Sequence, residues 1–361
     1  MKRIAANGLL ILAVSISACS NDNNEAPQSQ SVATTVSDDK VLDIAARAYE
    51  FAYPMILMDY TKKVATNVEQ PNSMGLAPIN QIGHFRQFPD DKFTAVVKPN
   101  VDTYYSNIWY DLQAEPAVLT VPASNRYYLL PHYDAYSNIF FVPGPRTTGT
   151  GAHTFLLTGP SWQGEVPEGM TQVKAPTNMV WMIGRTQVNS AEDGATVVAS
   201  FQDGLGVDLL SRYGKDYTPE KGVVTDEYKN IVPVDDTRAL TIEQYFTKFA
   251  KLMVANPPAA EDAALVAEMK SIGIEAGQPF SLARFSPQLQ EKLKTVPEQE
   301  HQKWIDMSTG KISAGVGVVN GWIFAVDGIG SYGTNYGYRA LIAFIGLGAN
   351  LAQDAVYPST S

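Results

Sequence analysis

YYSNIWYDLQAEPAVLTV, residues 104–121, contains two short runs rich in aromatic and β-branched residues, Tyr104–Leu112 and Ala117–Val121, with a proline just before the second. Such residues favour strands, and proline in the gap marks a turn. Further runs of this kind stand at Phe93–Val97, Tyr127–Leu130, Asn138–Val142, Thr154–Thr158 and Met179–Gly184. Closely spaced strands with turn residues between them are typical of an antiparallel sandwich or barrel. We therefore predict a β-rich region from about residue 90 to 188.

The remainder of the folded chain has helical spacing of apolar residues. One predicted helix begins near Asp38 or Asp39, either of which can cap it, and Pro54 should kink or end it. Two later helices each present one apolar face: Val197, Phe201, Leu205 and Leu209 in the first, and Tyr245, Phe249, Leu252 and Met253 in the second. Three more are predicted at Glu261–Ile274, Pro287–Leu293 and Thr334–Asn350. The sequence thus predicts one α+β fold over 38–361, with an antiparallel sandwich-like or barrel-like N-terminal half and a helical C-terminal half from about 190 to 350.

Composition excludes several classes of protein. The chain has 361 residues, with 27 Lys and Arg against 37 Asp and Glu, so its formal charge is −10. This acidity argues against nucleic acid as a partner, because phosphates require a basic face. The single cysteine excludes an intramolecular disulfide and cysteine-rich metal sites.

The first residues predict a targeting signal and a lipid anchor. Lys2 and Arg3 precede a short apolar stretch, which ends in Ile16-Ser17-Ala18-Cys19. That ending resembles a bacterial lipobox, in which the cysteine is lipidated and the peptide is cut just before it. We expect a signal peptide at 1–18, lipidation of Cys19 and a disordered polar tether over 19–37. Because Ser20 follows the cysteine, the resemblance favours the outer membrane, facing the periplasm; the alternative is an ordinary secretory peptide with a chance cysteine.

Common catalytic motifs are missing from the sequence. It has no Gly-x-Ser-x-Gly elbow, no phosphate-binding Walker loop, no dinucleotide-binding glycine pattern and no His-Glu-x-x-His. Standard serine hydrolases, nucleotide-binding enzymes and zinc proteases are therefore disfavoured. We predict neither a cofactor nor a dedicated metal site.

Tyrosines are concentrated between residues 99 and 137, where seven of the 18 in the chain occur. A tyrosine offers an apolar ring with a polar tip, so a cleft lined by tyrosines can stack on a ligand and also hydrogen-bond it. The alternative is that these tyrosines simply pack a sheet. The candidate ligand-binding residues here are Asn100, Tyr104, Tyr105, Tyr128 and Asp134.

Asp102, His132 and Arg339 are the candidates for chemistry. His132 and Asp134 lie on one strand face because side chains alternate, and Asp102 could join them as an acid–base pair or an oxygen-rich metal site. The alternative for His132 is a hydrogen-bonded histidine at a strand end. Arg339 stands on an apolar helix and requires a carboxylate if it is buried; we expect Asp102 to supply it. Arg339 is thus either a structural staple or an anchor for a substrate anion.

Three further residues extend the candidate ligand site. Tyr332 and Tyr336 precede Arg339 at spacings of 4 and 3, so a helix would place all three on one face. Arg146 and the threonines after it could bind an anion through backbone amides, or could form only a structural turn.

Several of these stretches together resemble the DUF1254 family. The matching motifs are Asn100-Val-Asp-Thr-Tyr-Tyr-Ser106, Arg126-Tyr-Tyr128, Gly144-Pro-Arg-Thr-Thr-Gly-Thr150, Gly159-Pro160 with Trp162 and Gly164, Gly184-Arg-Thr186 and Tyr332-Gly-Thr-Asn-Tyr336 with Arg339-Ala340. The resemblance runs from about residue 45 to 357 and implies a β-rich domain with helical segments, but no mechanism. Relatives commonly continue into a DUF1214 domain, whereas this sequence stops at Ser361. We therefore expect a DUF1214-like protein or a second copy of the chain as a partner that covers the surface left open; the alternative is that Leu351–Ser361 and the helical segment at 190–310 cover it themselves.

Taken together, these observations predict a cell-envelope lipoprotein that binds a small polar or aromatic ligand in a tyrosine-rich cleft formed by residues 99–153. If the protein is an enzyme, hydrolysis with Asp102 and His132 as acid–base groups is the form we expect. Asp102, His132 and Arg339 should then line one cavity. The alternative is a non-catalytic envelope scaffold whose aromatic face binds a protein partner.

Overall fold

The computed structural model describes residues 36–88, 100–310 and 317–360. Val36–Ser361 form one compact unit. The predicted signal peptide, Cys19, most of the tether and the predicted strand Phe93–Val97 lie outside the described residues. No helix in the described part of the chain is long and apolar enough to cross a bilayer.

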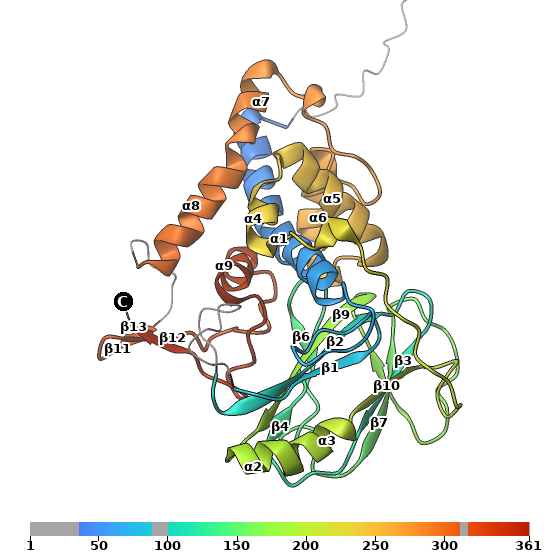
Figure 1. Cartoon of the computed structure of the whole chain (residues 1–361). Helices are drawn as coiled ribbons and strands as arrows, with labels where there is room; N and C mark the ends of the chain where they lie inside the picture. Colours follow the sequence, from blue (N-terminus) through green and yellow to red (C-terminus); the bar gives the residue numbers. More distant parts are fainter. Residues whose placement is uncertain (1–35, 89–99, 311–316, 361) are drawn as a thin grey trace, which may run out of the picture. The chain divides into compact units, whose positions relative to one another are not determined.

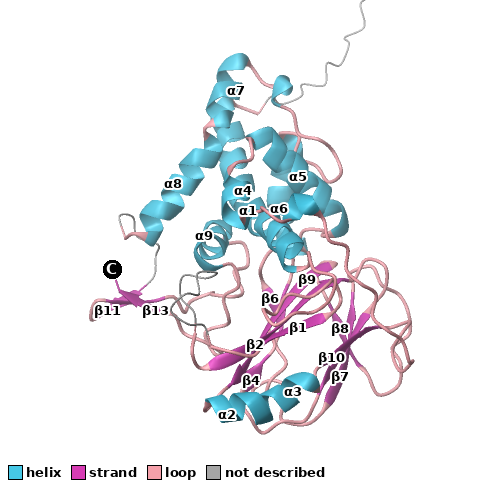
Figure 2. Ribbon diagram, viewed as in Figure 1, coloured by secondary structure: helices cyan, strands magenta, loops and turns pink. Residues whose placement is uncertain are grey.

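A six-stranded antiparallel sheet forms the middle layer of this unit (Figures 1 and 2). Its order is β1-β2-β9-β5-β6, and β4 also pairs with β9. The two longest strands, β2 and β9, pair over their whole length, from Thr103 opposite Gln187 to Asp111 opposite Met179. The strands of this sheet are β1 (Ile82–Phe85), β2 (Thr103–Asp111), β4 (Tyr128–Leu129), β5 (His132–Tyr133), β6 (Ile139–Phe141) and β9 (Met179–Gln187).

A four-stranded sheet packs against one face of the six-stranded sheet. Its order is β10-β3-β7-β8, and only the β7–β8 pair is parallel. Buried side chains of both sheets, such as Ile108 and Met182 from the first and Leu119 and Leu157 from the second, share one apolar cluster. Its strands are β3 (Ala117–Val121), β7 (His153–Thr158), β8 (Thr171–Lys174) and β10 (Gly206–Leu209). The predicted antiparallel, sandwich-like half is confirmed, whereas neither of the two sheets closes into a barrel.

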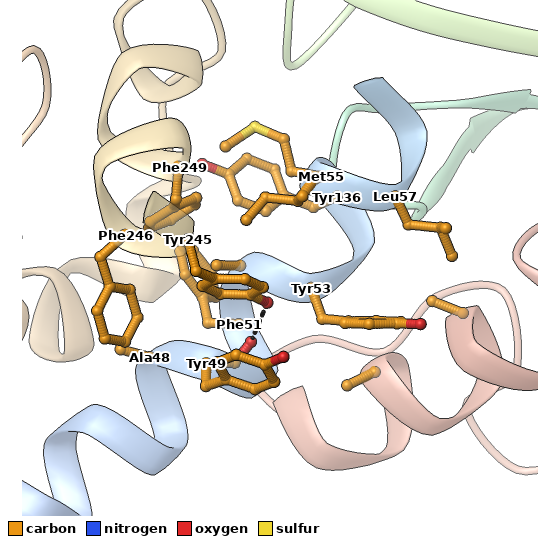
Figure 3. Packing of buried hydrophobic residues seen from close by; sticks show 14 of the residues in the cluster. Ala48, Tyr49, Phe51, Tyr53, Met55, Leu57, Tyr136, Tyr245, Phe246 and Phe249 are labelled. Atoms are coloured by element: carbon orange, nitrogen blue, oxygen red, sulfur yellow. Dashed lines mark hydrogen bonds between the residues drawn. The ribbon is translucent and has the colours of Figure 1, made fainter. Parts of the chain in front are cut away.

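The helix α1 (Asp38–Ala65) covers the other face of the six-stranded sheet and carries the larger apolar cluster. Its middle turns are buried on all sides between sheet and helices, as Figure 3 shows for Tyr49, Phe51 and Tyr53. The Tyr245 hydroxyl donates a hydrogen bond to the Tyr49 carbonyl at 2.8 Å. A helix that is apolar on every face has to be enclosed in this way.

The predicted cap of α1 is wrong, and so is an end of the helix at Pro54, which was one of the two effects expected of this proline. Ser37, not Asp38 or Asp39, is the cap, and its hydroxyl accepts a hydrogen bond from the Lys40 amide. Pro54 does not end the helix, which continues to Ala65. Pro54 is itself buried, so the packing that encloses these turns offsets the one backbone hydrogen bond that a proline removes.

The predicted helix face from Val197 to Leu209 is also incorrect beyond Asp203. The observed segment runs through α2 (Ala191–Asp193), one π-helical turn (Gly194–Val198) and α3 (Ala199–Asp203). Leu209 instead belongs to β10, where it pairs with Ala117. The wider π turn shifts the helical phase, and Val197 is 53% exposed while Phe201 is buried.

Further helices pack around α1 and confirm the helical C-terminal half (Figure 1). Tyr245, Phe249 and Met253 are buried on one face of α5, as predicted, while Leu252 is half-buried. The longer elements are α4 (Pro233–Arg238), α5 (Ile242–Ala255), α6 (Ala263–Ser271), α7 (Pro287–Lys294), α8 (Val296–Ser308) and α9 (Tyr336–Gly346). Short 3-10 turns occur at Asp226–Tyr228, Ala260–Asp262 and Leu282–Arg284, and a small antiparallel sheet contains β11 (Gly317–Val319), β12 (Trp322–Phe324) and β13 (Pro358–Thr360).

Candidate functional site

An open cleft of about 820 Å³ lies at the end of the six-stranded sheet, beside the π turn. The chain enters it after β3 and leaves it at β4, so Ser124 to Tyr127 form one wall. The other lining residues come from the end of β9 and from the helical segment that follows it. The full lining is Pro122, Ala123, Ser124, Asn125, Arg126, Tyr127, Gln187, Asn189, Thr196, Val197, Ser200 and Phe201.

Arg126 is fixed in this wall by an ion pair with Asp193. Its Nη2 and Nη1 donate to the two carboxylate oxygens at 2.6 and 2.9 Å, and Nη1 also reaches the Gln187 carbonyl at 3.2 Å. Asp193 additionally accepts from the Asn189 amide at 2.8 Å. Because the charge of Arg126 is balanced here, the cleft offers a ligand mainly hydroxyl and amide groups, with the apolar surfaces of Val197 and Phe201.

One face of the six-stranded sheet carries a row of aromatic and polar side chains. The register places Tyr105 opposite Arg185, Asn107 opposite Ile183 and Trp109 opposite Trp181, all on the same face. The two indoles stack at 5.2 Å between ring centroids, and the Trp181 Nε1 donates to the Asn107 side chain at 2.6 Å.

The C-terminal segment reaches the same sheet face. The Tyr357 hydroxyl accepts hydrogen bonds from the Asn350 amide at 3.0 Å and from its side-chain nitrogen at 2.8 Å. Arg185 Nη1 donates to the same hydroxyl at 3.4 Å, and its guanidinium lies 5.7 Å from the Tyr105 ring centre. This row ends close to the cleft, since Gln187 lies two residues beyond Arg185 on the same face of β9.

Asp102 and His132 do not meet, contrary to the prediction. Asp102 is exposed, and its carbonyl accepts from the Val188 amide just beyond the end of β9. His132 pairs with Met182, six residues back along that strand. At about 3.3 Å per residue the two positions are about 20 Å apart. An acid–base pair of these residues is therefore excluded by the strand register.

His132 instead has the structural role that we weighed as the alternative. It is fully buried between the two sheets, its Nδ1 donates to the Leu130 carbonyl at 2.8 Å, and its ring stacks on Tyr110. Burial lowers its pKa to about 4, so the ring is neutral near pH 7. Asp134 lies just beyond the end of this strand, and its carboxylate accepts from the Tyr136 and Asn138 amides, both at 2.9 Å, and closes a turn.

Arg339 is buried, as predicted, but Asp102 is not its partner. The guanidinium lies 5.1, 5.5 and 5.3 Å from the ring centres of Phe51, Tyr136 and Tyr336, and no partner accepts from its Nε or Nη2. Burial lowers its pKa, whereas the charges of Asp134 and Asp262 raise it. Asp102, His132 and Arg339 thus lie in three different places and share no cavity.

The other predicted ligand residues are mostly engaged within the fold. Tyr104 is buried against Gly194 of the π turn, and Tyr128 packs on Phe201 below the cleft. Arg146 forms a two-bond ion pair with Asp354, at 2.7 Å for each bond. Asn100 donates to the Thr103 hydroxyl at 2.8 Å and to the Tyr105 hydroxyl at 2.5 Å.

Tyr332 and Tyr336 are not neighbours on one helix, because α9 begins only at Tyr336. Tyr332 is buried before it, and Tyr336 donates to Asp262 at 3.0 Å. Among the described residues, no group of three or more His, Cys, Asp or Glu could hold a metal ion.

Sequence reasoning did not single out Arg185 or the helical wall of the cleft. A signal for Arg185 was present, because it is the lone charge in the otherwise apolar strand MVWMIGRTQ. The wall formed by Thr196 to Phe201 had no comparable signal, since the π turn that orients it is not visible in residue spacing.

Comparison with known proteins supports the family resemblance and the fold. Residues 79–208 match the family described as "Protein of unknown function (DUF1254)". The crystal structure of the VPA0106 protein from Vibrio parahaemolyticus is similar, with 22% identity and a TM-score of 0.60, over 87% of this chain and 69% of that one. At this identity the likeness concerns the fold alone.

A putative uncharacterized protein from Burkholderia cenocepacia is 10% identical, with a TM-score of 0.25, and the match covers 50% of this chain and 51% of that one. This likeness is too weak to support an argument. No curated protein matches the sequence significantly.

Proposed function

We propose a function from the geometry, because the family that residues 79–208 match is of unknown function. The protein is a cell-envelope lipoprotein that binds a small polar or aromatic ligand in the cleft beside Arg126. The observation that carries the proposal is the cleft itself. Its volume of about 820 Å³ is in the range of small-molecule sites, which are concave and have a few polar groups among apolar ones.

The lining suits a neutral part of such a ligand. Ser124, Asn125 and Ser200 offer hydroxyl and amide groups that can both donate and accept hydrogen bonds. Val197 is exposed beside them, so an apolar ring placed over it would remove apolar surface from water. The proposal includes no hydrolytic step, because Asp102 and His132 are separated by the strand register.

Binding of 4-hydroxybenzamide, a small neutral probe with an aromatic ring, tests this proposal. Ligand-observed NMR on the full chain should show binding that Ser200→Trp abolishes, because the indole fills the cleft. Ser211→Trp is the matched control, since Ser211 is exposed and does not line the cleft. Absence of binding to the wild type, or equal binding to Ser200→Trp, would refute the proposal.

The envelope location rests on the sequence alone. We propose that Cys19 is lipidated and holds the protein in the outer membrane, facing the periplasm, with residues 20–37 as the tether. Several acyl chains on one residue give firm anchoring, whereas a single chain gives marginal binding.

A second candidate function is a scaffold that binds a protein partner, either a DUF1214-like protein or a second copy of this chain. The observation that favours it is an exposed apolar pair at the tip of the β11–β12 hairpin. Val319 and Trp322 are cross-strand partners and are 59% and 47% exposed. Light scattering after size-exclusion chromatography should then show a dimer, or a monomer that captures a DUF1214-like protein; Trp322→Ser should abolish either. A monomer that captures nothing would contradict this function.

A further inference from the structure

Arg185 is half-buried and differs from Arg126 and Arg146, each of which has a carboxylate beside it. Its Nε is buried and has no hydrogen-bond partner. Its Nη1 has only the long bond to Tyr357, and no ion pair of Arg185 occurs among the described residues. Burial acts to lower the pKa of Arg185, and the nearby groups that raise it are tyrosines, Tyr357 and Tyr105 foremost. A buried cation without an anion is costly, so such a group commonly marks a place where an anion binds.

Arg146 and Arg126 show in the same molecule how a satisfied guanidinium is arranged. The Nε and Nη2 of Arg146 each donate to one oxygen of Asp354, which is the planar two-bond geometry that arginine forms with carboxylates. Arg126 binds both oxygens of Asp193 through Nη1 and Nη2, while its Nε has no described partner. At Arg185 the Nε donates to no described residue.

Arg339 also has unpartnered nitrogens among the described residues, but it is enclosed. Three aromatic rings surround it, it is only 2% exposed, and two carboxylates compensate its charge at longer range. Arg185, in contrast, is half-buried and lies among half-buried neighbours such as Tyr105, Asn107 and Tyr357. A small molecule can therefore approach Arg185, whereas Arg339 is closed off by its own rings.

We propose that Arg185 binds the carboxylate of a small organic acid through its guanidinium, beside Tyr105 and Tyr357. The inference deepens the proposed function, on which it rests, by naming the class of ligand. Gln187 lines the cleft two residues from Arg185, so a ligand in the cleft can extend one carboxylate to the guanidinium. The neutral cleft would then hold the body of the ligand, and the arginine would select the acid.

The pair 4-hydroxybenzoate and 4-hydroxybenzamide tests the charge alone, because the two probes differ only in carboxylate against amide. Calorimetric titration of the full chain near pH 7.5 should show 4-hydroxybenzoate binding at least about tenfold more tightly than 4-hydroxybenzamide. This is the affinity expected to be lost when a charge-assisted hydrogen bond is removed. Arg185→Gln should remove that preference and leave the binding of the amide unchanged. Arg212→Gln is the matched control. Like Arg185, Arg212 lies beside a tyrosine, 5.6 Å from the Tyr217 ring centre, but its side chain is half exposed.

The outcomes separate this inference from the proposed function. Binding of the amide with no preference for the acid overturns the inference and leaves the cleft proposal standing, whereas failure of both probes to bind overturns both. Equal displacement of 4-hydroxybenzoate by inorganic phosphate would overturn the assignment to a carboxylate. If Arg185→Gln does not fold, Arg185→Lys keeps the charge without the fork and should lose most of the preference; full retention of the preference would count against the site.

Discussion

Replacement of Arg339 by methionine should destabilise the protein, and the loss should depend on pH. Methionine fills much of the volume of the arginine stem but removes the charge that compensates Asp134. Removing one partner from a buried charge pair costs about 3–5 kcal/mol. We expect about 3 kcal/mol near pH 8, because Asp134 keeps its bonds from the Tyr136 and Asn138 amides.

The pH dependence follows from Asp134, whose burial raises its pKa to about 6. Near pH 5 its carboxyl group is mostly protonated in the folded state and requires no cation. The decrease in the free energy of unfolding should then be only about 1–2 kcal/mol, which is what the contacts of the guanidinium with three aromatic rings contribute. Without Arg339 the pKa of Asp134 rises further, so the folded variant binds a proton more readily and its stability declines as the pH rises.

Urea unfolding at pH 5 and pH 8, followed by tryptophan fluorescence, measures both free energies of unfolding. In an Asp134→Asn background the loss on Arg339→Met should become the same at both pH values, because asparagine keeps the turn but does not titrate. Arg212→Met, at an exposed position, should change the stability by less than about 0.5 kcal/mol. An equal loss at pH 5 and pH 8 in the wild-type background would refute the assignment of Asp134 as the electrostatic partner.

Three further changes have defined outcomes. Cys19→Ala should release the protein from membrane fractions or block its processing, and a fully processed variant that remains in the membrane fraction would contradict lipidation. Gly194→Val should lower the free energy of unfolding in urea by about 1–3 kcal/mol, since a Cβ there would lie 2.6 Å from the Tyr104 hydroxyl; unchanged stability would argue against this packing. Burial holds the pKa of His132 at about 4, so the neutral ring stabilises the fold above pH 6.5, and that stabilisation is lost as the pH falls toward 4. His132→Gln should therefore flatten the melting temperature as a function of pH between these values. An unchanged slope would exclude the effect.

Residue pattern predicted the strands of the sandwich well where local alternation decides them. Ala117–Val121 is a strand with the predicted bounds. The strand before it in the sequence was predicted at Tyr104–Leu112 and is observed at Thr103–Asp111. The prediction was wrong where tertiary contacts decide the conformation. Pro54 stays inside a helix because its surroundings enclose it, and Leu209 joins a strand because Ala117 lies beside it.

The candidate site was less predictable, because its geometry depends on residues far apart in the chain. Arg339 was correctly expected to be buried, but its compensating carboxylates are Asp134 and Asp262. Asp134 follows β5 and Asp262 ends a 3-10 turn, and sequence spacing does not show that both lie near α9. Tyr357 likewise reaches Arg185 from 172 residues away.

A crystal structure of the chain soaked with 4-hydroxybenzoate tests the central claim most directly. The account predicts ordered density for the ring in the cleft lined by Val197 and Ser200, with both carboxylate oxygens within hydrogen-bond distance of the Arg185 guanidinium. Density for the probe only at other places, or an empty cleft at a saturating concentration of the probe, would contradict it.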